Sequence, residues 1–268
     1  LAANLGKATP EDFARAIMTT DAFHKISHRE VSLPGGVVKL VGMAKGAGMI
    51  CPNMATMLSV VLCDAQVEAS VWQKMLRDAV ELTFNRVTVD GDTSTNDTLY
   101  GLANGASGVS ASDEESLKAL SAALTSVLGD LAYMLVKDGE GASKVARIHV
   151  AGAASDADAE RVARTVGHSQ LVKTALYGRD ANWGRIVAAV GRSGADFNPD
   201  DVVVTLCGVE LFRKGQPTDL DFDALLEEPL KQRDLPIDIV LGSGSGSYTL
   251  LASDLGHEYV NVNADYRS

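Results

Sequence analysis

Apolar and polar positions follow two different periods along this chain, one typical of strands and one typical of helices. Largely apolar runs over residues 37–43 and 57–62 predict two strands that lie close together in the sequence. Apolar residues recur every three to four positions over residues 71–84 and 117–131, which predicts two helices with one buried face each. The pattern therefore predicts a mixed α/β protein.

Three places in the first half of the chain have residue types that typically begin a helix. Residues 9–12 combine a capping threonine, a proline suited to the first helical position and two acidic side chains near the positive helix end. Ser70 is placed to cap the helix that follows it. Ser112 precedes Glu115 by three residues, which is the capping-box spacing. We therefore expect helices to begin at these places.

The second half of the chain mixes strands and helices in the same way. Residues 145–150, 202–207 and 237–241 are strand-like, and residues 158–166 are helical. Residues 151–158, which follow the strand-like residues 145–150, are small and polar. We therefore expect a boundary between two lobes near residue 155.

Composition restricts the class of protein. With 46% hydrophobic residues among 268, the chain has material for a large core. The net charge of −11, without a visible basic patch, argues against a nucleic-acid partner. No apolar run approaches membrane-spanning length and the start has no signal-peptide pattern, so we expect a cytoplasmic protein without a membrane partner. The three scattered cysteines argue against a disulfide framework.

One segment between the first two strands has an unusual composition. Residues 45–58 read KGAGMICPNMATML, with glycines that allow a tight turn, a lysine, and the small pair Ala55-Thr56 before the second strand. A threonine at that point would have a rigidly held hydroxyl. A threonine in a strand is usually only a β-branched packing residue. The residues alone leave both interpretations open, with packing as the more common one.

Residues 90–97 form the densest cluster of oxygen-bearing side chains. Asp90, Asp92 and Ser94 match the start of a calcium-binding loop, but Thr95 stands where that loop needs glycine and Gly101 where it needs glutamate. Such side chains also stabilise turns by bonding to nearby backbone. We interpret the segment as a structural, site-shaping loop and expect no metal.

The segment KGAGMICPNMATML resembles the self-cleavage segment of the ornithine acetyltransferase family, the arginine-biosynthesis enzymes also called glutamate N-acetyltransferases. Further segments resemble family blocks in the same order: AIMTTD, FNRVTVDGDTSTND, DGEGASK, LVKTALYGRDANWGRI and the closing NADYRS. The resemblance covers essentially all 268 residues, and several of these motifs are long and odd in composition.

The resemblance implies an α/β fold of the N-terminal-nucleophile-like kind. Residues 1–155 would form a layered α-β-β-α sandwich with the Ala55/Thr56 cleavage site, and residues 156–268 a smaller α+β lobe that completes the substrate site. It also implies a further N-terminal region, with a Thr-Gly pair that stabilises the oxyanion. One precursor would give α and β chains that assemble into a heterotetramer.

The resemblance also implies a reaction. The chain would cleave itself between Ala55 and Thr56, and Thr56 would then transfer the acetyl group of N-acetyl-L-ornithine to L-glutamate through a ping-pong acetyl-enzyme, releasing ornithine and N-acetylglutamate. The free α-amine of Thr56 would be the general base, because its ordinary pKa of about 7.7–8.0 lies close to physiological pH. No cofactor is implied, and acetyl-CoA stays open as a second acetyl donor.

Substrate-binding residues follow from the same likeness. Besides Thr56, it assigns this role to Thr19 (with Thr20 as the alternative), Lys45, Glu140, Asn263 and Ser268. Without the resemblance these would be a turn former, solvated charges and a frayed chain end. The family more often ends in threonine, but Ser268 keeps the hydroxyl. Residues 259–262, before this tail, are strand-like.

Two other functions remain as alternatives. An aminopeptidase or amidase with an N-terminal nucleophile on the same scaffold would use water instead of glutamate as acceptor. A non-enzymatic binding protein would have no use for a scissile Ala-Thr pair. Residues suited to a small amino-acid acceptor favour the transferase.

Overall fold

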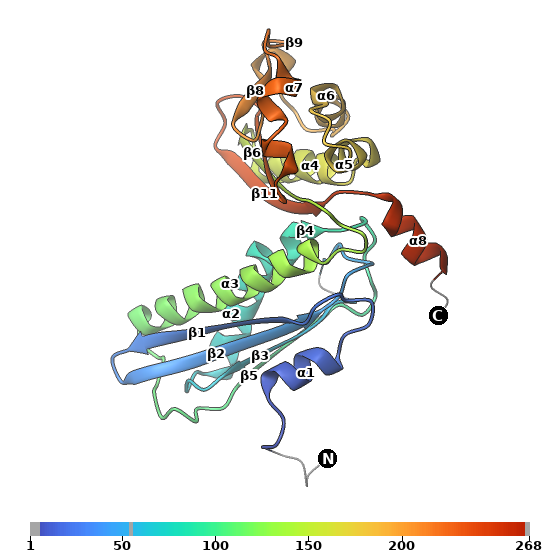
Figure 1. The fold of residues 1–268 in the computed structure, drawn as a ribbon. Helices are drawn as coiled ribbons and strands as arrows, with labels where there is room; N and C mark the ends of the chain where they lie inside the picture. Colours follow the sequence, from blue (N-terminus) through green and yellow to red (C-terminus); the bar gives the residue numbers. More distant parts are fainter. Residues whose placement is uncertain (1–5, 54–55, 266–268) are drawn as a thin grey trace. The chain divides into compact units, whose positions relative to one another are not determined.

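The chain divides into two compact units, Leu1–Val87 with Asp92–Gly139, and Thr88–Gly91 with Glu140–Ser268 (Figure 1). The computed structural model describes residues 6–53 and 56–265. Ala55 and Ser268 lie outside the described residues. Each unit combines helices with a β-sheet, so the predicted α/β class is confirmed.

The boundary between the units differs from the predicted one near residue 155. β6 (Val145–Ala153) pairs with β10 (Asp234–Val240) and β11 (Gly246–Ser253), so it belongs to the sheet of the second unit. The small polar residues after it only connect β6 to α4 (Asp156–Gly167). With the boundary at Gly139, the two units are nearly equal in length, whereas the sequence predicted a smaller second lobe.

The first unit contains a four-stranded sheet in the order β1-β2-β3-β5. Its strands are β1 (Lys25–Leu33), β2 (Gly36–Lys45), β3 (Leu58–Cys63) and β5 (Thr98–Ala103). β2 is antiparallel to β1 and β3, and β3 is parallel to β5. The two strands predicted on either side of residues 45–58 are thus confirmed, and they are direct neighbours in the sheet.

Helices α1 (Pro10–Ala16), α2 (Ala69–Leu82) and α3 (Glu114–Lys137) complete this unit. Figure 1 shows α2 and α3 on one face of the sheet. Thr9 caps α1, as the sequence predicts, and Asp12 completes a capping box with it. The other two caps are acidic residues near the predicted serines, Glu68 for α2 and Asp113 for α3.

α3 is long and apolar enough to cross a membrane by length and composition, which the sequence analysis did not expect. It is the single such helix in the described part of the chain. The same composition is typical of a core helix. Five of its leucines are completely buried, and it packs against β1 and β2 (Leu120, Leu124, Leu128, Leu131, Leu135). Its apolar face is therefore accounted for by the core of this unit.

The second unit is built on a seven-stranded sheet in the order β4-β11-β6-β10-β7-β8-β9. Its other strands are β4 (Val87–Thr88), β7 (Val203–Leu206), β8 (Val209–Arg213) and β9 (Gln216–Pro217), and its other helices are α5 (Gln170–Tyr177), α6 (Trp183–Gly191), α7 (Phe222–Leu226) and α8 (His257–Asp265). α4 packs on β6 and β11, burying Val162 and Val166 against the sheet. The strands predicted over residues 202–207 and 237–241 are confirmed as β7 and β10.

A buried lysine attaches the short segment Thr88–Gly91 to this unit. Lys173 Nζ donates hydrogen bonds to Val89 O at 2.8 Å and to Ser253 O. Burial lowers the pKa of Lys173 to about 8. The segment that leads into the polar loop of residues 92–97 is thereby fixed at its start.

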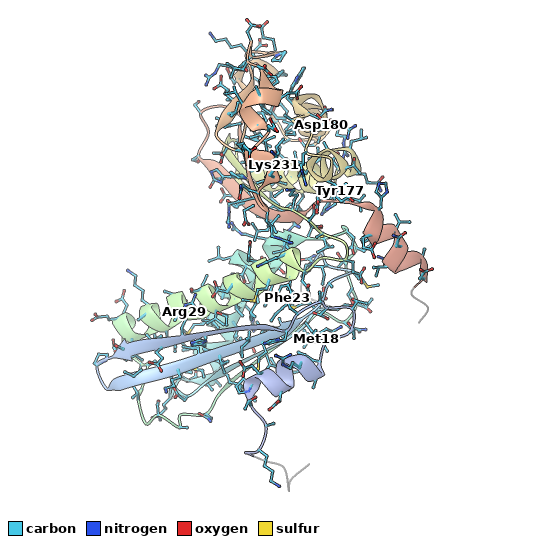
Figure 2. The ribbon with its side chains drawn as sticks, viewed as in Figure 1. Met18, Phe23, Arg29, Tyr177, Asp180 and Lys231 are labelled. Carbon is cyan, nitrogen blue, oxygen red and sulfur yellow. The ribbon has the colours of Figure 1, made fainter. Side chains whose placement is uncertain are left out.

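The strand predicted over residues 259–262 is wrong, because these residues lie inside α8. Aromatic and β-branched residues favour a strand only where they can pack on a half-buried surface. Val260 is 63% exposed, and α8 has no buried residue. The start of α8 rests on an aromatic contact instead, since the ring of Tyr177 (labelled in Figure 2) meets the ring of His257 edge-on.

Candidate active site

The segment between β2 and β3 leaves the sheet through a turn that needs glycine. Gly46 has φ +140, and a Cβ there would lie 2.8 Å from Ile50 Cδ1. Its N–H donates a 2.7 Å hydrogen bond to Asp21 Oδ1. Asp21 therefore fixes the direction in which the chain leaves Lys45 at the end of β2.

Asp21 belongs to a buried ion cluster that the sequence analysis missed. Lys25 Nζ donates to Asp21 Oδ1 at 2.6 Å and to Asp138 Oδ2 at 2.5 Å, and Lys25 is completely buried. Lys25 also lies 5.1 Å above the ring of Phe23, labelled in Figure 2. Burial acts to raise the pKa of Asp21, but the Gly46 N–H and the Lys25 ammonium outweigh it and lower that pKa.

Burial acts the opposite way on the third member of the cluster. It raises the pKa of Asp138 in spite of the hydrogen bond from Lys25. Two carboxylates and one ammonium thus share one dry site, with Asp138 also accepting from the N–H of Ala22. No local pattern could reveal this, because Lys25 and Asp138 are 113 positions apart.

Lys45 and Thr19, both predicted substrate-binding residues, come together in the first unit. Lys45 Nζ lies 3.5 Å from Thr19 Oγ1, and the N–H of Thr19 donates to Asp21 Oδ2 at 3.0 Å. Thr19, rather than Thr20, makes this contact. The Lys45 side chain is half-buried and Thr19 is exposed, so an ammonium and a hydroxyl are presented together at the end of β2.

Thr56 lies two residues before the start of β3, and its side chain has a defined environment. Its hydroxyl makes a short hydrogen bond with the Ser94 hydroxyl and lies 3.6 Å from Met49 Sδ. Ser94 is buried, and its Oγ also accepts from the N–H of Asn96 at 3.1 Å. A side chain of the polar loop therefore holds the predicted nucleophile.

Asp97, from the same loop, holds the residue after Thr56. Its Oδ1 accepts from the N–H of Met57 at 2.7 Å, and Met57 O in turn accepts from the N–H of Thr98 at 2.9 Å. Burial raises the pKa of Asp97 to about 6, while the Met57 N–H and the Lys45 charge act to lower it. The loop read as site-shaping thus contacts Thr56 and Met57 through two named side chains.

The metal interpretation of this loop has no further support. Among residues 6–53 and 56–265, no three His, Cys, Asp or Glu side chains are grouped so that they could hold an ion. The loop oxygens instead bond to protein groups, as Thr93 does by donating to Cys51 O at 2.9 Å. The loop contacts Cys51, Thr56 and Met57 through hydrogen bonds.

Glu140 and Asn263 form a pair in the second unit. Asn263 Nδ2 donates to Glu140 Oε2 at 2.8 Å and to Tyr259 O at 3.0 Å. Gly141, next to Glu140, has φ +68, and a Cβ there would lie 2.5 Å from Tyr259 N. The close approach of α8 to this turn therefore requires a glycine and brings the two predicted substrate residues together.

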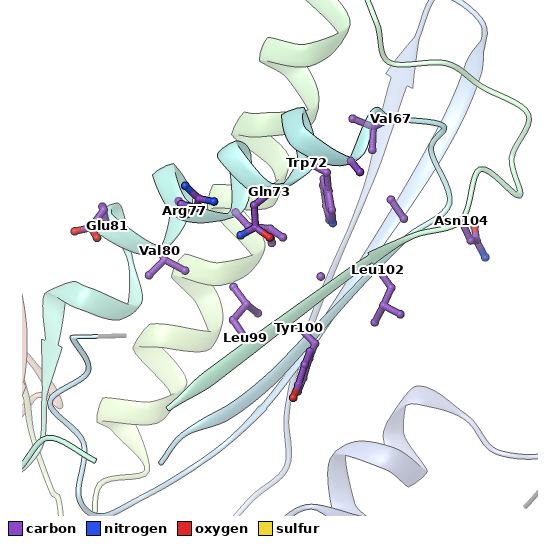
Figure 3. Close-up of a pocket in the computed structure, with 14 residues that line it drawn as sticks. Val67, Trp72, Gln73, Arg77, Val80, Glu81, Leu99, Tyr100, Leu102 and Asn104 are labelled. Atoms are coloured by element: carbon purple, nitrogen blue, oxygen red, sulfur yellow. The ribbon is translucent and has the colours of Figure 1, made fainter. Parts of the chain in front are cut away.

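A groove of about 830 Å³ in the first unit lies between α2 and β5 (Figure 3). Trp72 and Leu76 line it from α2, and Tyr100 and Leu102 from β5. Its lining includes neither Thr56 nor any other residue predicted for the site. It is mostly apolar and has no nucleophile, so the candidate site is the Thr56 region and not this groove.

The whole chain matches one known protein family. The ArgJ family model matches residues 1–268. The chain is 73% identical over 268 residues to the arginine biosynthesis bifunctional protein ArgJ of Nitratidesulfovibrio vulgaris, covering all of this chain and 68% of that protein. It is 46% identical over 270 residues to the protein of the same name from Geobacter sulfurreducens, covering all of this chain and 69% of the relative.

A solved structure is also similar. The crystal structure of the arginine biosynthesis bifunctional protein ArgJ from Bacillus halodurans matches with a TM-score of 0.72 at 36% identity, covering 76% of this chain and 96% of that one. The chain spans 59% of the length of the ArgJ protein of Chlorobium chlorochromatii and 69% of that of the Geobacter protein.

Proposed function

Because the chain belongs to the ArgJ family, we propose that it carries the nucleophile of a glutamate N-acetyltransferase, which moves the acetyl group of N-acetyl-L-ornithine to L-glutamate. The observation that carries the proposal is the placement of Thr56. Its hydroxyl is held by buried Ser94 two residues before β3, in the segment that resembles the family's self-cleavage site.

The first step of the proposal is cleavage of the chain. Thr56 Oγ1 attacks the carbonyl carbon of Ala55, the Ala55–Thr56 C–N bond breaks, and an ester forms between Ala55 and the Thr56 oxygen. Water then hydrolyses the ester, which releases the Ala55 carboxylate and leaves Thr56 with a free hydroxyl and a free α-amine. Holding a hydroxyl next to its own upstream carbonyl makes this reaction intramolecular, which favours it strongly.

Cleavage would also supply the base that transfer needs. A threonine hydroxyl is a weak nucleophile without a base. The described partners of the Thr56 hydroxyl are Ser94 and Met49, and neither side chain is a base at neutral pH. The α-amine that cleavage creates has an ordinary pKa of about 7.7–8.0, so a large fraction is neutral near pH 7.5. It is therefore the base in this proposal.

Acetyl transfer then takes two half-reactions. Thr56 Oγ1 attacks the acetyl carbonyl of N-acetylornithine, the amide C–N bond breaks, and ornithine leaves with the proton that the α-amine took from the hydroxyl. The amino group of glutamate attacks the resulting acetyl ester, which gives N-acetylglutamate and restores the hydroxyl. Ornithine, the product of the first half-reaction, leaves before the acceptor glutamate binds. This order of events gives ping-pong kinetics.

Substrate recognition is assigned to the charged and polar residues named above. The Lys45 ammonium suits a substrate carboxylate, with Thr19 beside it as a hydrogen-bonding partner. The Glu140 carboxylate suits an amino group, and Asn263 holds Glu140 in place. Ser268 is included on the resemblance alone. Acetyl-CoA stays open as a second donor.

The same proposal covers assembly and location. The two chains produced by cleavage would stay associated as α and β chains of a heterotetramer in the cytoplasm. Partners other than the small-molecule substrates are not required, and neither nucleic acid nor a membrane enters the reaction.

A matrix of donors and acceptors with the full-length enzyme tests this function. N-acetylornithine or acetyl-CoA is supplied with glutamate or with water alone, and N-acetylglutamate and free acetate are both quantified. We expect N-acetylglutamate to dominate when N-acetylornithine and glutamate are present. Acetate as the main product at saturating glutamate would overturn the transferase and support the amidase alternative.

A further inference from the structure

Asp97 is buried beside the predicted nucleophile, and one of its oxygens has no partner. The residue is 6% exposed. Its Oδ1 accepts from the N–H of Met57, whereas Oδ2 is fully buried without a hydrogen bond. Among the described residues, only Trp72 Nε1 is in the same condition, and it lies in the apolar groove of Figure 3.

An unpaired buried carboxylate oxygen needs an explanation. It has lost its hydration without gaining a protein donor, so it costs free energy in this state of the chain. This free-energy cost is offset if a hydrogen-bond donor lies next to the same oxygen in another state of the protein. The proposed cleavage produces such a donor near Asp97.

The new donor is the α-amino group of Thr56. In the uncut chain, the Thr56 nitrogen is an amide with one hydrogen, and after cleavage it becomes an amine or ammonium with two or three. Loop residues hold the two groups that directly follow this nitrogen, Ser94 at the Thr56 hydroxyl and Asp97 Oδ1 at the N–H of Met57. The Asp97 carboxyl is thus anchored one residue away from the group that cleavage releases.

We propose that Asp97 is a positioning residue for Thr56: after cleavage, Asp97 Oδ2 accepts a hydrogen bond from the Thr56 α-amino group and keeps that amine beside the Thr56 hydroxyl. This inference rests on the proposed function, because it requires the free α-amine. It gives the unpaired oxygen a partner and gives the general base a fixed orientation.

The charges around the pair are compatible with this role. Burial raises the pKa of Asp97 to about 6, so the group is mostly ionised at pH 7.5 and can accept from an ammonium. Lys45 at the end of β2 is the cation that acts on Asp97. The ion cluster of Asp21, Lys25 and Asp138 also contacts the segment after β2, because Asp21 accepts a hydrogen bond from the N–H of Gly46. Within that cluster, the Lys25 ammonium is the counter-ion of the two carboxylates. An ionised Asp97 would favour the protonated α-amine.

The test uses Asp97→Asn in the full-length enzyme. Asparagine keeps the shape and one oxygen to accept from Met57, but its second position is an uncharged donor. We expect cleavage to proceed, with Thr56 as the new N-terminus by mass spectrometry, and the KM for N-acetylornithine to change less than about twofold. The kcat should fall about tenfold or more, since a general base contributes about 10²–10⁴-fold when it is well placed.

The pH profile separates positioning from a loss of packing. Without the carboxylate, the pKa of the α-amine falls, so the acid limb of kcat should move to lower pH by about half a unit or more. Asp92→Asn removes the same charge from an exposed position of the same loop and should leave both kcat and the limb unchanged. A pure packing defect would lower kcat without moving the limb.

Several results would overturn the inference. A folded Asp97→Asn enzyme with wild-type kcat and pH profile would do so, and so would a folded protein that stays uncut, because Asp97 would then act before cleavage. If Asp97→Asn does not fold, the pH profile of kcat in the wild-type enzyme tests the inference instead. Its acid limb should lie at or above the ordinary pKa range of an α-amine, about 7.7–8.0. An acid limb below that range would reject the hydrogen bond between Asp97 and the α-amine. If wild-type protein neither cleaves nor transfers, the proposed function itself fails.

Discussion

Asn263 donates a hydrogen bond to Glu140 across 123 positions of the chain, from Nδ2 to Oε2 at 2.8 Å. The contact exists because α8 packs closely on the turn at Gly141, where a side chain would collide with the backbone of Tyr259. A carboxylate that is already oriented by an amide loses less freedom when it binds an amino group. The pair therefore has the form of a prepared binding contact.

Glu140→Gln should separate substrate binding from chain processing. The amide keeps an oxygen for Asn263 but loses the charge that would bind an amino group, so we expect the apparent KM for glutamate to rise about tenfold or more. Cleavage at Thr56 should be unaffected, as judged by two chains on a denaturing gel. Glu258→Gln, an exposed carboxylate on α8, is the matched control and should change neither quantity. Loss of cleavage in folded Glu140→Gln protein would instead assign Glu140 to processing.

Substitution of Thr56 tests the nucleophile directly. Thr56→Ala removes the hydroxyl, so the full-length protein should remain one uncut chain without transferase activity. Thr56→Ser keeps a hydroxyl and should still cleave, at a rate that a time course on a denaturing gel can measure. Two chains from Thr56→Ala, with the break before residue 56, would show that another group attacks the bond.

Gly46→Ala should destabilise the segment that leads from Lys45 to Thr56. Gly46 has φ +140, and an added Cβ would meet Ile50 at 2.8 Å, so we expect a loss of about 2–3 kcal/mol in the free energy of unfolding. Gly191→Ala, at the end of α6 with no atom within 4 Å of the added Cβ, is the control and should not destabilise. Equal denaturation midpoints for the two variants would contradict the requirement for glycine at position 46.

The pKa of Asp97 leads to a pH dependence of stability in the uncut protein. Its folded value of about 6 lies above the ordinary value of 3.8, so the folded state binds more protons between these pH values. The free energy of unfolding should therefore fall as pH rises from about 4 to 6, by no more than about 2 kcal/mol.

Comparison of two uncut proteins isolates this contribution. Thr56→Ala and the double variant Thr56→Ala/Asp97→Asn are unfolded with urea at several pH values. The difference between their stabilities should change over pH 4–6 and stay constant above about pH 7. Parallel profiles across the whole range would show that Asp97 does not titrate with a raised pKa.

Local sequence patterns predicted most of the elements around the site. These elements depend on contacts close in sequence or on backbone geometry. They include the start of α1 at Thr9 and Asp12, the strands on both sides of residues 45–58, and the glycine turn at Gly46. The close pairs Thr19–Lys45 and Glu140–Asn263 were singled out only because of the family resemblance. Their role in substrate binding stays a prediction.

Features that depend on tertiary contacts could not be read from the sequence. The sequence predicts a site-shaping loop that contains Ser94 and Asp97, but it does not show what they contact. Their contacts to Thr56 and Met57 span about forty positions and follow from the parallel pairing of β3 and β5. The same reason applies to α8. Its residues 259–262 look like a strand, but no sheet edge receives them, and they continue as a helix.

Removal of residues 263–268 should change what happens to the acetyl group more than whether the chain is cut. The deletion removes Asn263 and so frees Glu140. An acetyl-enzyme transfers to glutamate rather than to water only if the acceptor is held in attack geometry and the ester is shielded. We expect normal cleavage, slower formation of N-acetylglutamate, and a larger share of acetyl groups lost as acetate. A shorter deletion of residues 266–268 keeps Asn263 and serves as the matched control for its contribution. With N-acetylornithine as donor, the ratio of N-acetylglutamate to acetate is measured for both truncations, and a ratio and rate equal to wild type in the longer one would show that the tail has no part in transfer.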